Sequence, residues 1–510
     1  MQLAEQVGQM LMAGFHGLKA PEYILEWLAE GRIGGVILFA RNVDTPQQVA
    51  SLCEQLHVAA KYPLLIGIDQ EGGAVARLRE GFTQSPGAMA LAATDDLQLT
   101  EQVSQVLGRE MAALGINWTF APAVDISYNK ANPTVGVRSF GKDKETVSHF
   151  AAAAVRGFQE GGVAACAKHF PGLGDTAIDT HLALARVDAS VSHVIANDLM
   201  PYRATIDAGL ATVMTTHTLF TQLDAELPAT LSPVVIETLL RGELGFDGVV
   251  TTDCLEMRAI ADHYGAGESA VLAMLAGVDV ILFSHTRSMQ EAAYEAMLAA
   301  AQSGRVPDTI IADANRRIAQ LKAQFPAEVG DLSVIRSDAH LDLVAQASRQ
   351  ALVMLKNDAI IPLQSNQRVG VIEFASYLDS NVVEAGGQTG LCEQFRHALP
   401  DTQTLTLRVS ALDNHARAQA QQLAQNSDVL IVATRNAHLL AGELELAQQL
   451  LDQAERSILL ALRNPYDAEM LSADAVLCTL GDAEPSLHAV VDAVLGQLMP
   501  SGKLPVVVGV

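Results

Sequence analysis

Cysteine is scarce in this sequence, and its few residues are not arranged for a disulfide framework or a metal site. The 510 residues contain five cysteines, an odd number without CxxC spacing, at Cys53, Cys166, Cys254, Cys392 and Cys478. Scattered, unpaired thiols are typical of a reducing compartment. The start of the chain also lacks a basic stretch followed by an apolar run. We therefore expect a cytoplasmic protein without a signal peptide.

Long hydrophobic runs and an excess of basic charge are absent as well. No apolar stretch approaches the roughly 20 residues of a membrane span. The 33 basic and 58 acidic side chains give a formal net charge of −25, and a surface so acidic repels phosphate backbones. The phosphate-loop motif GxxxxGK[ST] is missing too. We expect no membrane or nucleic-acid partner, no cofactor and no metal ion, while the oligomeric state stays open.

What the chain does contain is a regular alternation of short apolar runs with amphipathic stretches. About eight strand–helix units in roughly 320 residues match a (β/α)₈ barrel of the TIM type, although an open doubly wound sheet would show the same alternation. We predict a catalytic TIM-type barrel over residues 1–330. Its candidate strands are residues 10–15, 33–39, 64–68, 116–121, 163–167, 211–216, 247–252 and 278–283.

A smaller second domain is predicted after a segment that is rich in Pro, Gly and mixed charge. We place a linker at residues 331–345 and a C-terminal α/β sandwich domain with a mainly parallel sheet at residues 346–510. The candidate strands of this domain are residues 351–355, 369–373, 428–433, 457–462, 475–480 and 504–508.

Titratable side chains follow five of the predicted barrel strands. Because the carboxyl ends of all barrel strands meet at one mouth, where barrel enzymes carry their chemistry, we expect these side chains to converge. Asp253 could serve there as a nucleophile or base, or could simply cap the next helix. Asp69 with Glu71 could ligate a metal, but no further ligands follow at useful spacing. The residues are Asp69, Asp125, Lys168 with His169, His217 and Asp253.

The loop KHFPGLGDTAIDTH at 168–181 concentrates groups that can move protons. An aspartate beside an imidazole fixes its tautomer and stabilises its protonated form, so Asp179 and His181 could act as a proton shuttle. Taken alone, such a pair is more often a solvated polar turn. Lys168 and His169, at the strand end that feeds the same loop, favour the functional interpretation.

In order along the chain, these motifs resemble the bacterial β-N-acetylglucosaminidases of glycoside hydrolase family 3, a group that includes cytoplasmic peptidoglycan-recycling enzymes. The resemblance spans nearly the whole chain, because two later stretches are similar to the second domain of longer members. The barrel stretches are GGVILFARN (34–42), GIDQEGGAVARL (67–78), APAVDI (121–126), RSFG (138–141), KHFPGLGDTAIDTH (168–181), LPATLS (227–232), LLRGELGFDGVVTTDCLEM (239–257) and AGVDVILF (276–283). The later ones are ALVMLKNDAIIPL (351–363) and PSGKLPV (500–506).

The resemblance implies removal of non-reducing terminal GlcNAc from peptidoglycan fragments or chitooligosaccharides, with retention of anomeric configuration. Asp253 would attack the anomeric carbon and form a covalent glycosyl–enzyme intermediate. His181, paired with Asp179, would protonate the leaving oxygen and then deprotonate the incoming water. The implied substrate-binding residues are Asp69, Arg77, Arg138, Lys168 and His169.

Three other activities stay open at this point. Phosphorolysis is compatible with the same pair, because a neutral histidine base does not repel an incoming phosphate as a carboxylate would. Lys168 at a strand end could form a Schiff base, as in barrel aldolases, but this leaves Asp253 unexplained. An inactive sugar-binding barrel would have no need of Asp253, Asp179 and His181 together.

Overall fold

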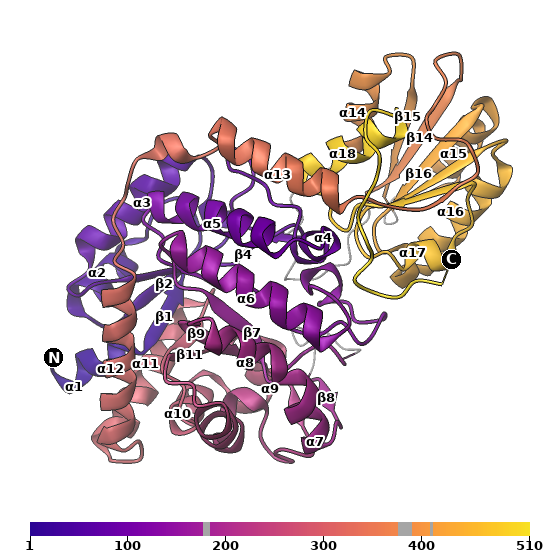
Figure 1. Cartoon of the computed structure of the whole chain (residues 1–510). Helices are drawn as coiled ribbons and strands as arrows, with labels where there is room; N and C mark the ends of the chain where they lie inside the picture. The colour runs from indigo at the N-terminus through magenta and orange to yellow at the C-terminus, as the bar shows by residue number, and fades with distance from the viewer. Residues whose placement is uncertain (177–183, 376–389, 409–411, 510) are drawn as a thin grey trace.

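Parallel strands alternate with helices through the N-terminal two thirds of the computed structural model, which describes residues 1–176, 184–375, 390–408 and 412–509 (Figure 1). Eight of these strands coincide with the eight predicted from the sequence. They are β1 (Leu11–Gly14), β2 (Gly35–Leu38), β3 (Leu65–Ile68), β6 (Trp118–Thr119), β7 (Cys166–Phe170), β9 (Thr212–Thr215), β11 (Val249–Thr252) and β12 (Ile281–Phe283).

The eight strands follow one another around a ring. Continuous parallel ladders join β12-β1-β2-β3-β6 and β7-β9-β11. The two ladders meet through isolated parallel bridges, Trp118 with Ala164 and Thr251 with Val280. Backbone hydrogen bonds support both junctions, at 2.9 Å from Thr119 N–H to the Ala164 carbonyl and at 3.1 Å from Thr252 N–H to the Val280 carbonyl. The predicted TIM-type barrel is confirmed.

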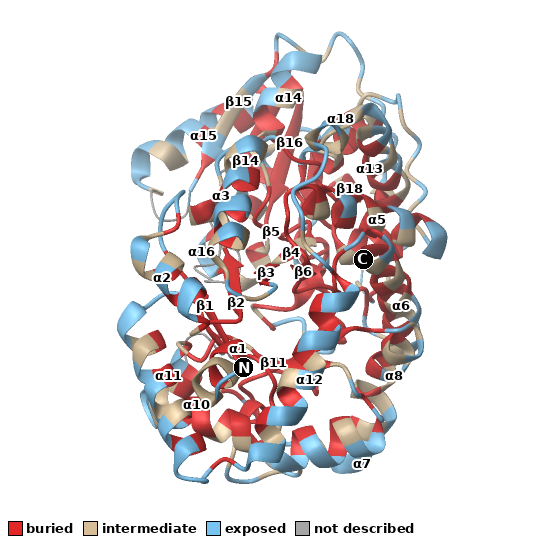
Figure 2. Ribbon diagram, turned by 90° about the vertical axis from the view of Figure 1, so that its left-hand side faces the viewer, coloured by how far each residue is buried: buried red, intermediate tan, exposed pale blue. Residues whose placement is uncertain are grey.

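Amphipathic helices surround the ring, and Figure 2 shows their exposed residues facing outward while the strands are buried. Three of them begin where the sequence supplies a side-chain oxygen for a free backbone N–H. Thr45, Asp96 and Asp143 accept from the first turns of α3, α5 and α6. The helices are α1 (Leu3–Gln9), α2 (Glu22–Glu30), α3 (Pro46–Ala59), α5 (Leu97–Ala113), α6 (Lys144–Glu160), α8 (Met200–Asp207), the π-helical η5 (Val234–Glu243), α10 (Ala266–Leu275), α11 (Arg287–Gln302) and α12 (Asp308–Gln324).

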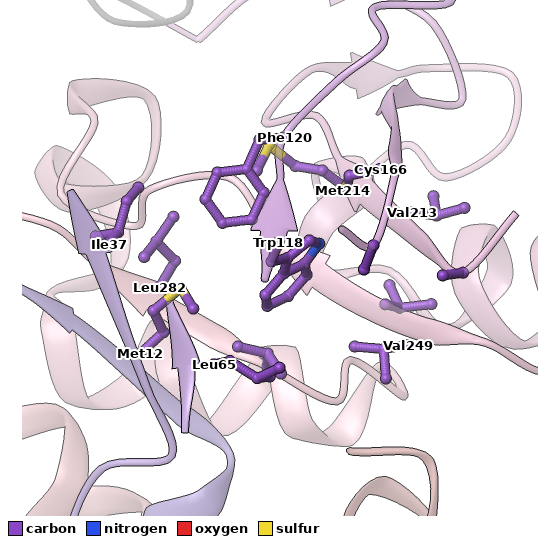
Figure 3. Close-up of a cluster of buried hydrophobic side chains, with 14 of the residues drawn as sticks. Met12, Ile37, Leu65, Trp118, Phe120, Cys166, Val213, Met214, Val249 and Leu282 are labelled. Atoms are coloured by element: carbon purple, nitrogen blue, oxygen red, sulfur yellow. The ribbon is translucent and has the colours of Figure 1, made fainter. Parts of the chain in front are cut away.

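Large apolar side chains fill the inside of the barrel (Figure 3). Met12 of β1, Leu65 of β3, Trp118 of β6 and Phe120, just after β6, are all buried. The Trp118 indole N–H donates to Thr212 Oγ1 at 2.8 Å, so the polar atom of this side chain is satisfied. Because side chains fill the interior, the barrel is a packed core, and its chemistry is confined to the ends of the strands.

A six-stranded sheet in the order β13-β18-β17-β16-β14-β15 forms the C-terminal part. Only the edge strand β13 runs antiparallel to its neighbour, so the predicted α/β domain with a mainly parallel sheet is confirmed. The strands are β13 (Val353–Asn357), β14 (Val369–Phe374), β15 (Gln403–Leu407), β16 (Val429–Thr434), β17 (Ser457–Ala461) and β18 (Ala475–Cys478). The helices are α14 (Leu391–Ala398), α15 (Asn414–Asn426), α16 (Ala441–Gln453), α17 (Asp467–Met470) and α18 (Glu484–Val494).

For this sheet, one strand was missed and one predicted strand is wrong. The edge strand β15 was not predicted, because three of the five residues of its sequence QTLTL are polar and only Leu407 is buried. The predicted strand at 504–508 is irregular. Its backbone binds the barrel domain instead: the Pro505 carbonyl accepts from Lys142 N–H at 3.2 Å, and Lys503 N–H donates to the Ala93 carbonyl at 2.9 Å.

The two parts of the chain pack against each other through apolar side chains. The segment predicted as a linker contains the start of α13 (Asp338–Ala351), which contacts α5, α18 and α4 (Ala88–Ala93). Met89 and Val137 of the barrel domain belong to the same buried cluster as Phe374 and Tyr466 of the second domain. Within the described ranges, no helix has both the length and the apolar character needed to cross a membrane.

Candidate active site

Four charged side chains form one connected cluster at the carboxyl ends of the barrel strands. Lys168 Nζ lies 2.8 Å from Asp69 Oδ1 and 2.7 Å from Glu71 Oε1. Arg138 donates through Nε and Nη2 to the two oxygens of Glu71, at 2.9 and 2.7 Å. We refer to Asp69, Glu71, Arg138 and Lys168 as the barrel network. It brings together three of the predicted substrate-binding residues and adds Glu71.

A tight hairpin explains the spacing of the motif GIDQEGGAVARL. After Asp69 the chain forms β4 (Gln70–Gly72), turns, and returns as β5 (Val75–Ala76). Gly73 has a φ of +57°, and a Cβ there would lie 2.8 Å from the Cα of Gly87, so only glycine fits this turn. The return strand brings Arg77 Nη2 to 3.3 Å from Asp69 Oδ2. The glycine pair therefore serves to place an arginine beside a carboxylate.

The barrel network keeps its carboxylates ionised. Burial by itself raises the pKa of Glu71, but Arg138 and Lys168 outweigh it and lower that pKa to about 2. Burial likewise opposes ionisation of Asp69, and Lys168 and Arg77 hold its pKa well below the usual range. The side chain of Asp69 is 17% exposed, against 6% for Glu71 and 2% for Lys168. Asp69 is therefore the member that a ligand can reach.

Lys168 is an ammonium ion in this setting. Burial acts to lower its pKa, but the charges of Asp69 and Glu71 reverse the effect, and the pKa is raised. A protonated amine that is held between two carboxylates is not a nucleophile. This geometry argues against the Schiff-base alternative.

His169 is oriented by Asp125. Its Nδ1 lies 2.7 Å from Asp125 Oδ2, while Asp125 Oδ1 accepts the backbone N–H of Leu173 at 2.7 Å. An imidazole whose Nδ1 is bound in this way presents Nε2 to a ligand. Asp125 thus holds both the histidine and the start of the loop that follows it.

Asp253 stands at the end of β11 and does not cap a helix. Its Oδ1 accepts the N–H of the next residue, Cys254, at 2.7 Å. The following helix, α9 (Arg258–Tyr264), begins five residues later with Met257 at its N-cap. The capping interpretation is therefore wrong, and the partly exposed carboxylate has no such structural role.

Asp253 belongs to the same region of the mouth as the barrel network. The thiol of Cys166, at the start of β7, experiences both: burial raises its pKa to about 12, Lys168 acts to lower it, and Asp69 and Asp253 act to raise it. His217, which follows β9, has Nε2 2.9 Å from the carbonyl oxygen of Cys254, the residue after Asp253. Residues at the ends of β3, β7, β9 and β11 thus lie at the same mouth of the barrel.

Asp179 and His181, the predicted proton-transfer pair, lie outside the described residues. The segment that leads to them is held firmly to the barrel. Asn132 Nδ2 donates to the Leu173 carbonyl at 2.9 Å. A Cβ on Gly174 would lie 1.6 Å from the Ile126 carbonyl oxygen, so no side chain fits there. The loop therefore leaves the barrel from a fixed point beside His169.

Sequence reasoning did not select Glu71 and Asp125 as site residues. Glu71 entered it only as a metal ligand, although its position two residues after Asp69 puts it on the same hairpin. Asp125 was noted at a strand end, but the interaction that defines its role is with His169, 44 residues away. Such pairings depend on strand neighbours, which one sequence does not display.

The mouth of this parallel barrel carries ionised carboxylates, two buried cations and an aspartate that caps no helix. These features define the chain as a barrel enzyme. Comparison with protein families then gives its identity. Residues 2–321 match the model of the glycosyl hydrolase family 3 N terminal domain, and residues 352–509 match that of the glycosyl hydrolase family 3 C-terminal domain. The chain belongs to glycosyl hydrolase family 3 and is a glycoside hydrolase.

Individual relatives match either nearly the whole chain or about two thirds of it. Beta-hexosaminidase A of Pseudoalteromonas piscicida is 30% identical and covers 96% of this chain and 91% of its own length. The solved family 3 β-N-acetylglucosaminidase of Paenibacillus sp. str. FPU-7 is 38% identical, with a TM-score of 0.94 over 99% of both chains. The β-N-acetylhexosaminidase of Beutenbergia cavernae DSM 12333, 34% identical with a TM-score of 0.59, matches 63% of this chain and 99% of its own. The resemblance to this branch of the family is confirmed.

Proposed function

We propose that the protein is a retaining exo-β-N-acetylglucosaminidase that removes non-reducing terminal GlcNAc from peptidoglycan fragments or chitooligosaccharides. The observation that carries the proposal is the barrel network at the same mouth as Asp253. The ionised, accessible carboxylate of Asp69 and the buried ammonium of Lys168 accompany an aspartate that caps no helix. Charged groups of this kind form strong hydrogen bonds with sugar hydroxyls. The names of the Pseudoalteromonas and Paenibacillus relatives agree with this substrate class.

In the first step, Asp253 attacks the anomeric carbon of the bound GlcNAc. Its Oδ1 is held by the Cys254 N–H, so Oδ2 is the oxygen that forms the bond. His181 donates its proton to the glycosidic oxygen, and the aglycone leaves. The sugar stays bound through Asp69, Arg77, Arg138, Lys168 and His169.

In the second step, water takes the place of the aglycone. His181, now neutral, removes a proton from the water, which attacks the anomeric carbon and releases Asp253. Asp179 stabilises the protonated histidine in the first step and fixes its tautomer in the second. The two inversions together retain the configuration.

All of these groups lie in residues 1–330, which we assign as the catalytic domain, with residues 346–510 as a packed partner domain. We further place the enzyme in the cytoplasm. The described cysteines are all free and buried, which fits a reducing compartment.

The test is turnover of a GlcNAc–MurNAc fragment and of chitobiose, each with and without phosphate, followed by NMR of the sugar product. We expect free β-GlcNAc at the same rate in both buffers. GlcNAc 1-phosphate as the main product would establish the phosphorolysis alternative instead. No turnover of either substrate would contradict both activities.

A matched pair of substrates tests the histidine. His181→Ala should slow the natural disaccharide by about 10²–10⁴-fold, the range for loss of general acid–base catalysis. A dinitrophenyl glycoside, whose leaving group needs no proton, should lose far less in its first step. Equal losses on the two substrates would show that His181 does not carry the proton.

A further inference from the structure

Three side chains that the hydrolytic mechanism does not use come together directly after the proposed nucleophile. Cys254 and Glu256 follow β11, and His285 follows the neighbouring strand β12. Their ligand atoms, a thiol sulfur, a carboxylate oxygen and an imidazole nitrogen, all lie within 4.8 Å of one another. Cys254 is buried, Glu256 is half-buried and His285 is exposed, so the cluster opens to solvent on the histidine side.

Backbone hydrogen bonds to the Glu256 carboxylate hold this cluster in place. The Glu256 carboxylate accepts the backbone N–H of His285 at 2.7 Å and that of Thr286 at 3.0 Å. These bonds tie the loop after β11 to the loop after β12. The carboxylate oxygens keep further lone pairs for another ligand. The three donors are therefore preorganised by two neighbouring barrel strands.

We propose that Cys254, Glu256 and His285 form a binding site for a borderline-soft divalent cation, with Zn²⁺ as its best occupant. Thiolate, imidazole and carboxylate are the ligands that Zn²⁺ takes, in tetrahedral geometry, and three protein ligands leave one position for water or another side chain. Mg²⁺ and Ca²⁺ prefer sets made of oxygen alone. The exposed imidazole of His16, whose ring centre lies 6.3 Å from that of His285, is a candidate for the fourth position.

Binding of the cation requires the Cys254 thiol to lose its proton to solvent, because the metal binds the thiolate. The cation therefore competes with that proton. Affinity should rise with pH as that competition weakens.

The position of the site predicts its effect on hydrolysis, and this consequence rests on the proposed function. The backbone N–H of Cys254 donates to Asp253 Oδ1 at 2.7 Å. The carbonyl oxygen of Cys254 lies 2.9 Å from His217 Nε2. A metal that draws the cysteine toward Glu256 and His285 shifts the residue that orients the nucleophile. Zn²⁺ should therefore inhibit the enzyme reversibly.

The direct test uses Co²⁺ as a spectroscopic substitute for Zn²⁺ on the intact, substrate-free protein. Co²⁺ should produce a thiolate-to-metal charge-transfer band together with the strong visible bands of tetrahedral cobalt, and added Zn²⁺ should abolish both. His285→Asn lies on the exposed loop and should weaken Co²⁺ binding by at least about tenfold. Cys254→Ser should remove the charge-transfer band altogether. In the control Cys53→Ser, which changes a buried thiol of α3, the band should be unchanged.

Absence of a charge-transfer band in the folded wild-type protein would overturn the site, as would a band that survives Cys254→Ser.

Inhibition by Zn²⁺ is measured in a separate experiment, with a nitrophenyl GlcNAc substrate and reversal by EDTA. Zn²⁺ should inhibit the wild type at least about tenfold more strongly than His285→Asn. A cobalt band without inhibition would keep the site and reject its coupling to Asp253. A protein that turns over no GlcNAc substrate can still show the band, so the two proposals fail independently.

Discussion

The barrel network has a counterpart in the second domain, and the two differ in what can reach them. Arg435, after β16, pairs with Glu373 of β14 at 2.7 Å and with Asp482, after β18, at 2.9 Å. Arg463, after β17, lies 3.1 Å from Asp482. We refer to these four residues as the sheet network. Both networks contain two carboxylates and two cations at the carboxyl ends of parallel strands.

Exposure separates the two networks. The side chains of Arg435, Glu373 and Asp482 are at most 1% exposed, whereas that of Asp69 is 17% exposed and lies near the partly exposed Asp253. The sheet network sits where the strand order reverses, between β14 and β16, and Arg435 also donates to the Phe374 carbonyl at 2.9 Å. Open sheets often bind ligands at such a point, but here protein charges fill it. A buried ion-pair network therefore does not by itself mark an active site; an accessible carboxylate beside it does.

The largest expected effect is on catalysis by Asp253, at the mouth that carries the barrel network. Asp253→Ala should fold with an unchanged melting temperature and lose turnover by about 10⁴-fold or more, as expected for loss of a nucleophile. A 2-fluoro or 5-fluoro glycosyl fluoride should label Asp253 in the wild type, as peptide mass spectrometry would show. The control Asp262→Ala, an exposed carboxylate on α9, should keep full activity. Labelling at another carboxylate would remove Asp253 from its assigned role.

The sheet network should respond in stability rather than in catalysis. Arg435→Met leaves Glu373 and Asp482 short of a positive charge in a buried site, which costs about 3–5 kcal/mol of unfolding free energy. Urea unfolding, followed by a probe in each domain, measures the loss. KM of the protein that remains folded should change less than about twofold, because Arg435 touches no substrate. A raised KM with normal stability would mean that the sheet network binds substrate, and the contrast would collapse.

Single changes in the barrel network should act on sugar binding instead. Alanine at Asp69, Arg138, Lys168 or His169 should weaken the affinity for GlcNAc by about 1–3 kcal/mol, the scale of hydrogen bonds that involve a charged group. Arg77 should have a smaller effect, since it reaches the sugar site through Asp69 at 3.3 Å. Calorimetric titration of GlcNAc gives these values, with Arg463→Met as the control from the sheet network. Unchanged affinity in all four variants would place the sugar site elsewhere.

Most of the architecture could be predicted from the sequence, because strand periodicity and strand–helix alternation are local properties. The eight barrel strands were found because each lies at or beside a short, mostly apolar run. The edge strand β15 was missed because its half-polar sequence lacks that signal. Residues 504–508 were taken for a strand because the contacts of Pro505 with Lys142, and of the preceding Lys503 with Ala93, are not visible in sequence. Apolar composition does not reveal which partner a backbone segment will find.

For the site, the sequence identified which residues lie at strand ends but not which of them pair. Asp69, Lys168 and Arg138 were all selected, whereas the bidentate contact of Glu71 with Arg138 spans 67 residues. The role of Asp253 depended on whether a helix starts directly after it. Only the observed start of α9 at Arg258 decides that question. Pairing and accessibility are three-dimensional properties, and they distinguish the barrel network from the sheet network.

The smallest expected effect is an acid dependence of stability that arises in the barrel network. The pKa of Glu71 is about 2 in the folded protein, against an ordinary value of 4.5, because Arg138 and Lys168 outweigh the effect of burial. As the pH falls below about 4.5, the unfolded chain takes up this proton first, so the folded state loses stability until the pH reaches about 2. The slope from one such group is at most about 1.4 kcal/mol per pH unit.

Glu71→Gln should remove this part of the slope, as urea unfolding at pH 5, 4 and 3 would show. The stability of the variant at pH 7 should fall, because two cations lose a partner. Asp69 and Asp482 have lowered pKa values as well and keep the remaining slope in the variant. If Glu71→Gln keeps the full wild-type slope between pH 5 and 3, Glu71 is not the ionised centre of the barrel network, and the two networks differ in more than exposure.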